Sequence, residues 1–389
     1  MLNASGGTLL GATNYYHNLL LAIADSKRIQ PVLLTAGKLP GAICDGLPPM
    51  EVVKSPFAGI TGLHNVARRA AKRLFDRDVA LEGVLKANNI GVFSHAGSLG
   101  RGSRVATTAW IADFQHTKLP ELFSPDELAQ RDGYFRRCAE GCTVIIVSSE
   151  DARRDFAAFL PQYAHKARVL PFVSLAGRFH ADDDTAAAIM NRYDIVDPYF
   201  HLPNQFWKHK NHAVVVEALK LARQRGTPLK VVSTGHTADR RHPDHFPALV
   251  EQIKVAGCTE DFKILGVVPY GDAATLMRYA VAIINPSLFE GWSTSVEESK
   301  SLGKTVILSD IPVHREQAPP HGHYFAPHEA EALLEHMVSV RSSYTREGDL
   351  IQQALAQQQF PERLRGFAMA YEDIVLEAYA HNEAQWART

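Results

Sequence analysis

The stretch Val281–Ser309, VAIINPSLFEGWSTSVEESKSLGKTVILS, decides the fold of this chain. Its apolar run Val281–Ile284 predicts a buried strand, and the loop Pro286–Gly291 follows it. A short helix then leads to Gly303, which is typical of a residue that ends a helix, and a second buried strand is predicted at Thr305–Leu308. In a strand, loop, helix, strand unit of this kind, ligands bind at the carboxyl ends of the strands.

Two glutamates occupy the ligand-facing part of this unit. Glu290 lies in the loop after the first strand, and Glu298 lies eight residues further on, about one turn inside the helix. Both carboxylates can therefore point into one crevice. The pairs Thr294 with Glu297 and Ser295 with Glu298 also fit the S/T-x-x-E capping box, in which the glutamate binds backbone amides. Local chemistry alone leaves the ligand-binding and capping interpretations open.

The whole pattern is more specific than the pair of glutamates. It resembles the donor-site signature of family 4 of the retaining glycosyltransferases, through Phe289-Glu290-Gly291-Trp292, Glu298, Gly303 and the strand containing Val306-Ile307. The resemblance implies the GT-B fold, an α/β architecture of two Rossmann-like parallel-sheet domains facing across a cleft. It implies an acceptor-binding domain at residues 1–175, joined by a returning helix at 366–389, and a nucleotide-sugar-binding domain at 190–365.

The resemblance also implies roles for individual residues. Glu290 would contact the sugar hydroxyls, Glu298 the ribose diol, and Lys210 the leaving diphosphate, together with the amides of the loop that contains Gly291, Trp292, Ser293 and Thr294. Transfer of a hexose-type sugar would retain the anomeric configuration. Protein cations and helix dipoles would neutralise the leaving group without a metal ion. No cofactor is expected besides a nucleotide-sugar co-substrate such as a GDP-, UDP- or dTDP-sugar.

Length and composition agree with two domains. The chain has 389 residues and a net charge of −1, so nothing in its overall charge attracts it to nucleic acid. No apolar run is long enough to predict a transmembrane helix, and no signal peptide is predicted. The four cysteines lack the spacing of a zinc site, which favours reduced thiols in a cytoplasmic protein.

The amino-terminal stretch carries a glycine-rich loop. Gly6, Gly7 and Gly11 precede a predicted helix at Ala12–Ala24, and such a loop can bring backbone amides close to a phosphate. Gly11 is therefore a candidate donor-binding residue, although glycines of this kind are more often turn residues. In the resembled family an apolar strand precedes the loop. Met1–Ser5 leaves little room for one, which predicts that the first strand is absent or replaced.

Strand and helix signals alternate after this point, which favours βα units around a parallel sheet. Strands are predicted at Pro31–Ala36, Gly91–Ser94, Val105–Ala109 and Thr143–Val147. An amphipathic segment at 63–77 carries four basic residues at helical spacing, namely Arg68, Arg69, Lys72 and Arg73. A solvated face is one interpretation of this pattern, and peripheral contact with an anionic membrane on its cytoplasmic side is the other.

The segment Ala109–Ser124 is the candidate acceptor-side wall. It is similar to the HD-L-Q-H…P-E-x-F-S stretch of part of the same family, but the family's histidine before the aspartate falls on Ala112. Asp113 and His116 are the polar residues left as catalytic candidates. The alternative for His116 is a loop histidine that binds backbone.

A linker between the domains is predicted at Ser174–Asp197. It contains Asp182-Asp183-Asp184, an acidic run like the metal-binding motif of the other main transferase architecture. No strand precedes the run to hold a metal, so a flexible acidic linker is the preferred interpretation.

The second domain offers further donor-binding candidates. Lys208 and Lys210 lie just before a predicted helix at Ala213–Arg225, a good position for cations that bind a diphosphate. Lys210-Asn211 matches the family's Lys-Asn, whereas the family's arginine falls on Asn204. The strand after this helix ends at Gly235, and Tyr270 follows the next strand, where its ring could stack on the base.

These observations predict a retaining glycosyltransferase that moves a sugar to a glycan, lipid-linked or small-molecule acceptor. Two other interpretations stay open. One is a GT-B epimerase or phosphorylase. The other is a catalytically silent protein that binds sugar nucleotides, which the departures at Ala112 and Asn204 favour.

Overall fold

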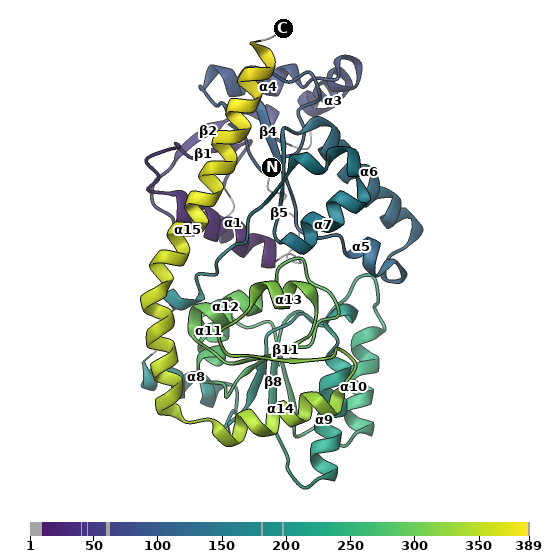
Figure 1. Cartoon of the computed structure of the whole chain (residues 1–389), viewed down its shortest axis with the longest axis vertical. Coiled ribbons are helices and arrows are strands. Elements are labelled where there is room, and N and C mark those ends of the chain that lie inside the picture. The colour runs from purple at the N-terminus through teal and green to yellow at the C-terminus, as the bar shows by residue number, and fades with distance from the viewer. Residues whose placement is uncertain are drawn as a thin grey trace. The chain divides into compact units, whose positions relative to one another are not determined.

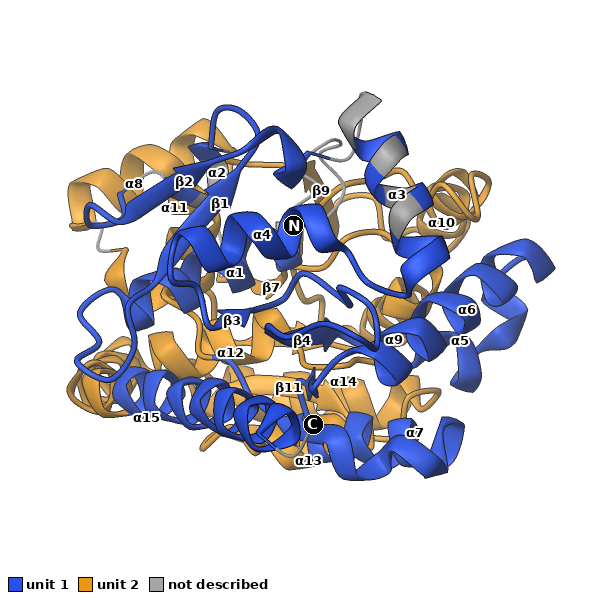
Figure 2. Cartoon of the chain, turned by 90° about the horizontal axis from the view of Figure 1, so that it is seen from above, with its two compact units in different colours: residues 1–172, 363–389 blue, residues 173–362 orange. Residues whose placement is uncertain are grey.

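The computed structural model describes residues 10–39, 41–44, 46–59, 63–179, 182–196 and 198–387. The chain forms two compact units, one of Met1–Phe172 with Arg363–Thr389 and one of Val173–Glu362 (Figure 2). All paired strands in the described part are parallel. The predicted α/β fold with parallel sheets in two domains is therefore confirmed. Gly6 and Gly7 lie outside the described residues.

The second unit (Val173–Glu362) is built on a six-stranded sheet (Figure 1). Its strands are β7 (Phe200–Leu202), β8 (Val231–Thr234), β9 (Phe262–Gly266), β10 (Ile283–Asn285), β11 (Val306–Ser309) and β12 (Gly322–Phe325). The strand order is β12-β11-β10-β7-β8-β9. This is the order of a doubly wound sheet, whose direction of winding reverses between the first strand, β7, and the fourth, β10.

Helices cover both faces of this sheet. The helices of the unit are α8 (Asp183–Arg192), α9 (His212–Gln224), α10 (His245–Val255), α11 (Tyr270–Tyr279), α12 (Thr294–Leu302), α13 (Pro312–Gln317) and α14 (Ala330–Ser343). One buried cluster joins the strands to α9, α10 and α14, and a second joins them to α8, α11 and α12. Apolar strands buried on both sides explain why β10 and β11 lack an alternating pattern.

The first unit (Met1–Phe172 with Arg363–Thr389) contains two sheets in its described part. β1 (Val32–Thr35) pairs with β2 (Glu51–Lys54), and a four-stranded sheet has the order β3-β4-β5-β6, with strands at Val92–Phe93, Ala106–Ile111, Val144–Val147 and Ala167–Val169. Its helices are α1 (Leu10–Ile23), α2 (Gly41–Cys44), α3 (Leu63–Phe75), α4 (Val79–Ala87), α5 (Gln115–Lys118), α6 (Pro125–Gly141) and α7 (Glu150–Phe159). Short 3₁₀ turns occur at Pro56–Ala58, Pro120–Leu122, Pro161–Lys166, Ala176–Arg178 and Lys208–Lys210.

The last helix, α15 (Arg346–Trp386), begins well before the returning helix that is expected at 366–389. Pro361 lies inside it, where the sequence alone favours a helix end. The helix nevertheless continues through the proline, and the division between the two units falls at the next residue pair, Glu362 and Arg363.

The prediction of a flexible acidic linker is wrong for much of its length. Residues Asp183–Arg192 form helix α8, and the Asp182 side chain accepts a hydrogen bond of 2.8 Å from the Thr185 amide at its amino end. Asp182 is thus the N-cap, and Asp183 and Asp184 complement the helix dipole in the first turn. The acidic run has a local structural role that its composition did not reveal.

Candidate functional site

The candidate donor site lies where the winding of the second unit's sheet reverses. β7 and β10 are neighbours there, and each continues at its carboxyl end into a loop. The loop after β7 leads to α9 on one face of the sheet, and the loop after β10 leads to α12 on the other face. The β7 loop supplies Lys210 and the β10 loop supplies Glu290. Their side chains form an ion pair of 2.6 Å, with 14% and 9% of the side-chain surface exposed. Two sequence candidates 80 residues apart are thus in direct contact.

Glu290 is held by more than the lysine. The Ser287 hydroxyl donates a hydrogen bond of 2.7 Å to Glu290 Oε1, the same carboxylate oxygen that Lys210 contacts. The Ser287 amide donates to Asn285, and the Ser287 carbonyl accepts from the Ser309 hydroxyl on β11. Asn211, in a left-handed conformation with φ of 56°, donates to the Pro286 carbonyl at 3.0 Å and so ties the β7 loop to the β10 loop. Sequence reasoning did not identify Asn285 or Ser287 as supports.

Asn204 and Gly235 shape the same loops from beneath. The Asn204 side chain is buried and lies within hydrogen-bonding distance of Asn285 and Ser295, at 3.4 and 3.5 Å. Gly235 has a φ of 145°, and a Cβ there would lie 2.4 Å from the Asn204 carbonyl oxygen. Only glycine permits this approach of two backbones. The structure therefore places Asn204 under the loop rather than at its surface.

The amino end of α12 is not closed by a capping box. Ser293 is the N-cap and makes no side-chain cap hydrogen bond, so the capping interpretation of Glu297 and Glu298 is wrong. The Ser293 amide instead donates to Gln317 at 3.1 Å. Thr294 is the first helical residue, and the half-exposed Gly291 and Trp292 precede the N-cap in the loop. Gln317 was missed because it lies on α13, after the next strand.

Glu298 is buried on α12, with 8% of its surface exposed. The Tyr270 hydroxyl donates to its carboxylate at 3.0 Å. Burial raises the pKa of Glu298 to about 7, and the hydrogen bond from Tyr270 acts in the opposite direction. The Tyr270 ring packs edge-on against Phe179, with centroids 4.9 Å apart. Its hydroxyl contact with Glu298 was not foreseen, since the sequence suggested stacking on a base.

The remaining donor candidates occupy different positions. Lys208 is exposed, and its amide donates to Asp239 at 3.2 Å. Gly11 is not in a loop but is the second residue of α1 in the other unit. His209, between the two lysines, is buried, and burial lowers its pKa well below the usual value, so it is not a cation.

The acceptor-side candidates of the first unit are engaged within that unit. Asp113 accepts from the Gln115 amide at 3.0 Å and from Arg131 at 2.6 Å. His116 is 3% exposed and lies among four phenylalanine rings, with Asp132 3.1 Å from its Nε2. Desolvation lowers the pKa of His116. The neutral, enclosed ring indicates a packing role within the helices that follow β4.

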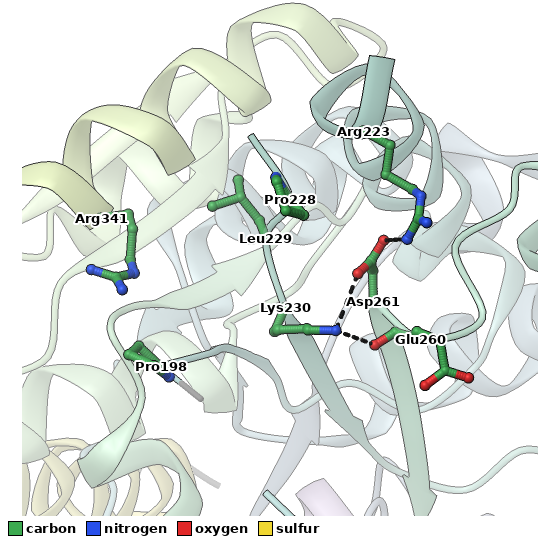
Figure 3. Close-up of a pocket in the computed structure, with 8 residues that line it drawn as sticks. All are labelled: Pro198, Arg223, Pro228, Leu229, Lys230, Glu260, Asp261 and Arg341. Carbon is green, nitrogen blue, oxygen red and sulfur yellow. Dashed lines mark hydrogen bonds and ion pairs between the residues drawn. The ribbon is translucent and has the colours of Figure 1, made fainter. Parts of the chain in front are cut away.

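A cavity of about 500 Å³ opens at the amino ends of the strands of the second unit's sheet, opposite the candidate donor site (Figure 3). Pro198, Lys230 and Asp261 line it, just before β7, β8 and β9. Asp261 binds both Arg223, at 2.5 Å, and Lys230, at 3.3 Å. The charged side chains of the cavity are therefore largely paired with one another. The cavity also lies at the amino ends of the strands, whereas doubly wound sheets bind nucleotides at the carboxyl ends.

The described residues contain no cluster of three or more histidine, cysteine, aspartate or glutamate residues that could hold a metal ion. None of the helices in these ranges is long and apolar enough to cross a membrane.

The chain is similar to known proteins in part of its sequence and in its fold. Residues 196–357 match the family described as "Glycosyl transferases group 1". No curated protein sequence matches the chain.

Solved structures resemble the chain over nearly its whole length. A glycosyltransferase from Rickettsia africae has a TM-score of 0.67 at 14% identity, covering 97% of this chain and 96% of its own. Anabaena HepE in complex with UDP and glucose has a TM-score of 0.62 at 14% sequence identity, and the match covers 100% of this chain and 96% of HepE. WaaG, a glycosyltransferase involved in lipopolysaccharide biosynthesis, has a TM-score of 0.55 at 15% sequence identity, and the match covers 98% of this chain and 95% of WaaG. At these identities the likeness establishes the GT-B fold.

Proposed function

We propose that the protein is a retaining glycosyltransferase that moves a hexose-type sugar from a nucleoside diphosphate to a glycan, lipid-linked or small-molecule acceptor. The group 1 domain at residues 196–357 supports the transferase class. HepE, which shares the fold, is described in complex with UDP and glucose and with UDP-glucose. These neighbours support a nucleotide-sugar donor, such as a UDP-, GDP- or dTDP-sugar.

The observation that carries the proposal is the ion pair between Lys210 and Glu290 at the carboxyl ends of β7 and β10. In the free protein the two charges compensate each other in a half-buried site. A bound donor brings a diphosphate to Lys210 and a sugar to Glu290. Lys210 would then stabilise the charge that develops on the leaving diphosphate, and Glu290 would hold the sugar hydroxyls.

The helix α12 supplies the other two parts of the proposed donor site. Its first-turn amides lack a side-chain cap from Ser293 and point toward the loop, where a helix dipole favours an anion. Glu298 in the next turn would accept hydrogen bonds from the ribose diol, beside the one from Tyr270. Cations and amides thus take the part that a metal ion has in other transferases, and we propose that transfer needs none.

Calorimetric titration of UDP, GDP and dTDP tests the donor site. The Lys210→Met variant should bind the preferred nucleotide at least ~10-fold more weakly, because it loses a charge-assisted hydrogen bond. This variant also leaves Glu290 without its partner, so the double variant Lys210→Met/Glu290→Gln is needed. It should show the same loss if the cation is what matters. Lys254→Ala, which changes an exposed lysine on α10 that is 61% exposed, is the control.

Two results would overturn the assignment: no nucleotide binding to the wild type, or equal affinity in the wild type and both Lys210 variants. Donor hydrolysis and transfer, followed by NMR of the anomeric proton, separate a retaining transferase from the alternatives. A silent protein would bind nucleotide without turnover. An epimerase would convert the donor without releasing nucleotide.

We further propose peripheral contact with an anionic membrane through the end of α3. Leu74 and Phe75 are 79% and 69% exposed there, and Arg73 beside them is exposed. The basic face is smaller than the sequence suggested, since Arg68 binds Asp78 at 2.9 Å and Lys72 donates to the Ser98 carbonyl. Co-sedimentation with vesicles that contain phosphatidylglycerol tests this, and equal sedimentation of wild type and Leu74→Ser/Phe75→Ser would contradict it.

A further inference from the structure

A second concentration of unusual side chains lies in the first unit, at the carboxyl end of its four-stranded sheet. Ser94 and His95 follow β3 directly, Trp110 is the penultimate residue of β4, and Ser148 follows β5. The carboxyl ends of parallel strands are where α/β units bind ligands. Trp110 belongs to the predicted acceptor-side wall at Ala109–Ser124, whereas the other three were not candidates from the sequence. No role in the donor site uses any of them.

His95 is the centre of this cluster. Its φ of 57° is a left-handed conformation, which is uncommon outside glycine but which histidine adopts more often than most residues. Its Nε2 lies 2.7 Å from the Tyr15 hydroxyl, and its Nδ1 lies 2.8 Å from the Ser94 hydroxyl. Its amide donates to Thr108 on β4 at 3.1 Å. Strained conformations that surrounding contacts hold in place are concentrated at functional sites.

The network around the ring is neutral and closed. Ser94 accepts from the Tyr371 hydroxyl at 2.9 Å and lies 3.0 Å from the Thr108 hydroxyl. Burial lowers the pKa of His95 to about 3, so the imidazole carries no charge near neutral pH. With so low a pKa the ring is a weak base, and hydroxyl groups lie within hydrogen-bonding distance of both ring nitrogens. Its remaining surface is a partly exposed aromatic face.

Aromatic rings surround that face. Tyr16 lies edge-on to His95 and to Trp110, with centroids 5.7 and 5.8 Å apart. Trp110 stacks on the buried Tyr15 at 4.1 Å, and its Nε1 donates to Ser148 at 3.0 Å. Tyr16 and Trp110 are partly exposed, and no partner for the Tyr16 hydroxyl is found within the described ranges. A purely structural core has no need to leave these three rings accessible at a strand end.

We propose that Tyr16, His95 and Trp110 form a binding site for an uncharged sugar, the acceptor of the transfer. The rings offer apolar faces to the C–H face of a pyranose, and the Tyr16 hydroxyl offers a hydrogen bond to its hydroxyls. None of the described residues of the cluster is a lysine or an arginine. A sugar phosphate would need such cations, so the site selects a neutral acceptor. This inference rests on the proposed function, because a sugar bound here is an acceptor only if the second unit binds the donor.

Saturation-transfer NMR on the full chain tests the proposal with two probes, methyl α-D-glucopyranoside and glucose 6-phosphate. The ring protons of the glycoside should receive saturation from the wild type, and glucose 6-phosphate should bind more weakly. Tyr16→Leu and His95→Asn should each weaken glycoside binding by about fivefold, the scale of one lost aromatic contact. Asparagine suits the second variant because it tolerates a left-handed backbone.

Phe75→Ala is the matched control, since it removes an exposed aromatic side chain of the same unit. Melting temperatures and nucleotide affinity show that each variant is folded, and the nucleotide titration fails separately if the donor site is wrong. Three results would overturn the proposal: no saturation transfer from the wild type, the same weakening in Phe75→Ala as in Tyr16→Leu, or tighter binding of glucose 6-phosphate than of the glycoside.

Discussion

Glu298 combines burial with a single hydrogen-bond partner in the described part of the chain, the Tyr270 hydroxyl. The pKa of Glu298 is raised from 4.5 to about 7 in the folded protein. Between pH 4.5 and 7 the carboxyl group is therefore protonated in the folded protein but ionised in the unfolded chain. The contribution of Glu298 to the free energy of unfolding is thus full below pH 4.5 and is lost as the pH rises through 7. The loss is at most ~3 kcal/mol.

The Glu298→Gln variant tests both consequences of this titration. Without nucleotide, its melting temperature should exceed that of the wild type at pH 8 but not at pH 4. With nucleotide, its affinity should be ~10-fold or more below the wild type at pH 8, because a charge-assisted hydrogen bond to the ribose is lost. Wild-type affinity should rise with pH through 7, and Tyr270→Phe should move that midpoint upward. Unchanged nucleotide affinity in Glu298→Gln would show that the carboxylate is structural.

Glu290 should behave differently from Glu298. Glu290→Gln removes the charge that compensates Lys210 in the free protein, so nucleotide affinity should stay equal or increase. If Glu290 stabilises positive charge at the anomeric carbon, kcat should fall by ~10²-fold or more. Kinetics and calorimetry on the same preparation check this. A parallel loss of affinity and kcat would contradict separate roles.

At the scale of the elements, two glycines form a matched pair. Gly303 ends α12 with a φ of 67°, and a Cβ there would lie 2.3 Å from the Gln352 carbonyl oxygen on α15. Gly226 follows α9 with a φ of 69° and has nothing within 4 Å of that position. Both should lose about 1–2 kcal/mol on substitution by alanine because of the left-handed backbone. Gly303→Ala should lose more, since α12 and α15 must separate.

Denaturant unfolding of the two variants measures the difference directly. The excess loss in Gly303→Ala reports on how firmly α15 fixes the carboxyl end of the helix that carries Glu298. Equal losses would mean that the chain adjusts at this contact without cost, and the helix would then be positioned by its other contacts, such as the 2.8 Å hydrogen bond from Ser301 to the Ser174 carbonyl.

At the scale of the whole molecule, the proposed chemistry predicts independence from divalent metals. Lys210 and the first-turn amides of α12 would neutralise the diphosphate, and the acidic run at Asp182 caps α8 instead of following a strand. Turnover should be the same in EDTA as in buffer with Mg²⁺. Activity that disappears in EDTA and returns with Mg²⁺ or Mn²⁺ would refute the assignment of the diphosphate site.

The sequence by itself determined the strands β10 and β11, the helix between them and the residue types of the proposed donor loops. Apolar runs buried on both faces predicted β10 and β11, and the glycine after α12 predicted where that helix ends, because these signals depend on neighbouring residues alone. Local signals failed where a distant contact decided the outcome. The segment at Pro361 is helical although its sequence favours a helix end, and the acidic linker folds into α8.

Only the tertiary structure decided which candidates meet. Lys210 and Glu290 are 80 residues apart and touch because β7 and β10 are adjacent in the sheet, an order that no local pattern encodes. Glu298 was chosen for its spacing from Glu290, but its partner Tyr270 comes from another helix. The cluster around His95 joins residues of α1, β4, α15 and the loop after β3, so its members look ordinary in sequence. Packing of elements that are distant in the chain is what creates a site of this kind.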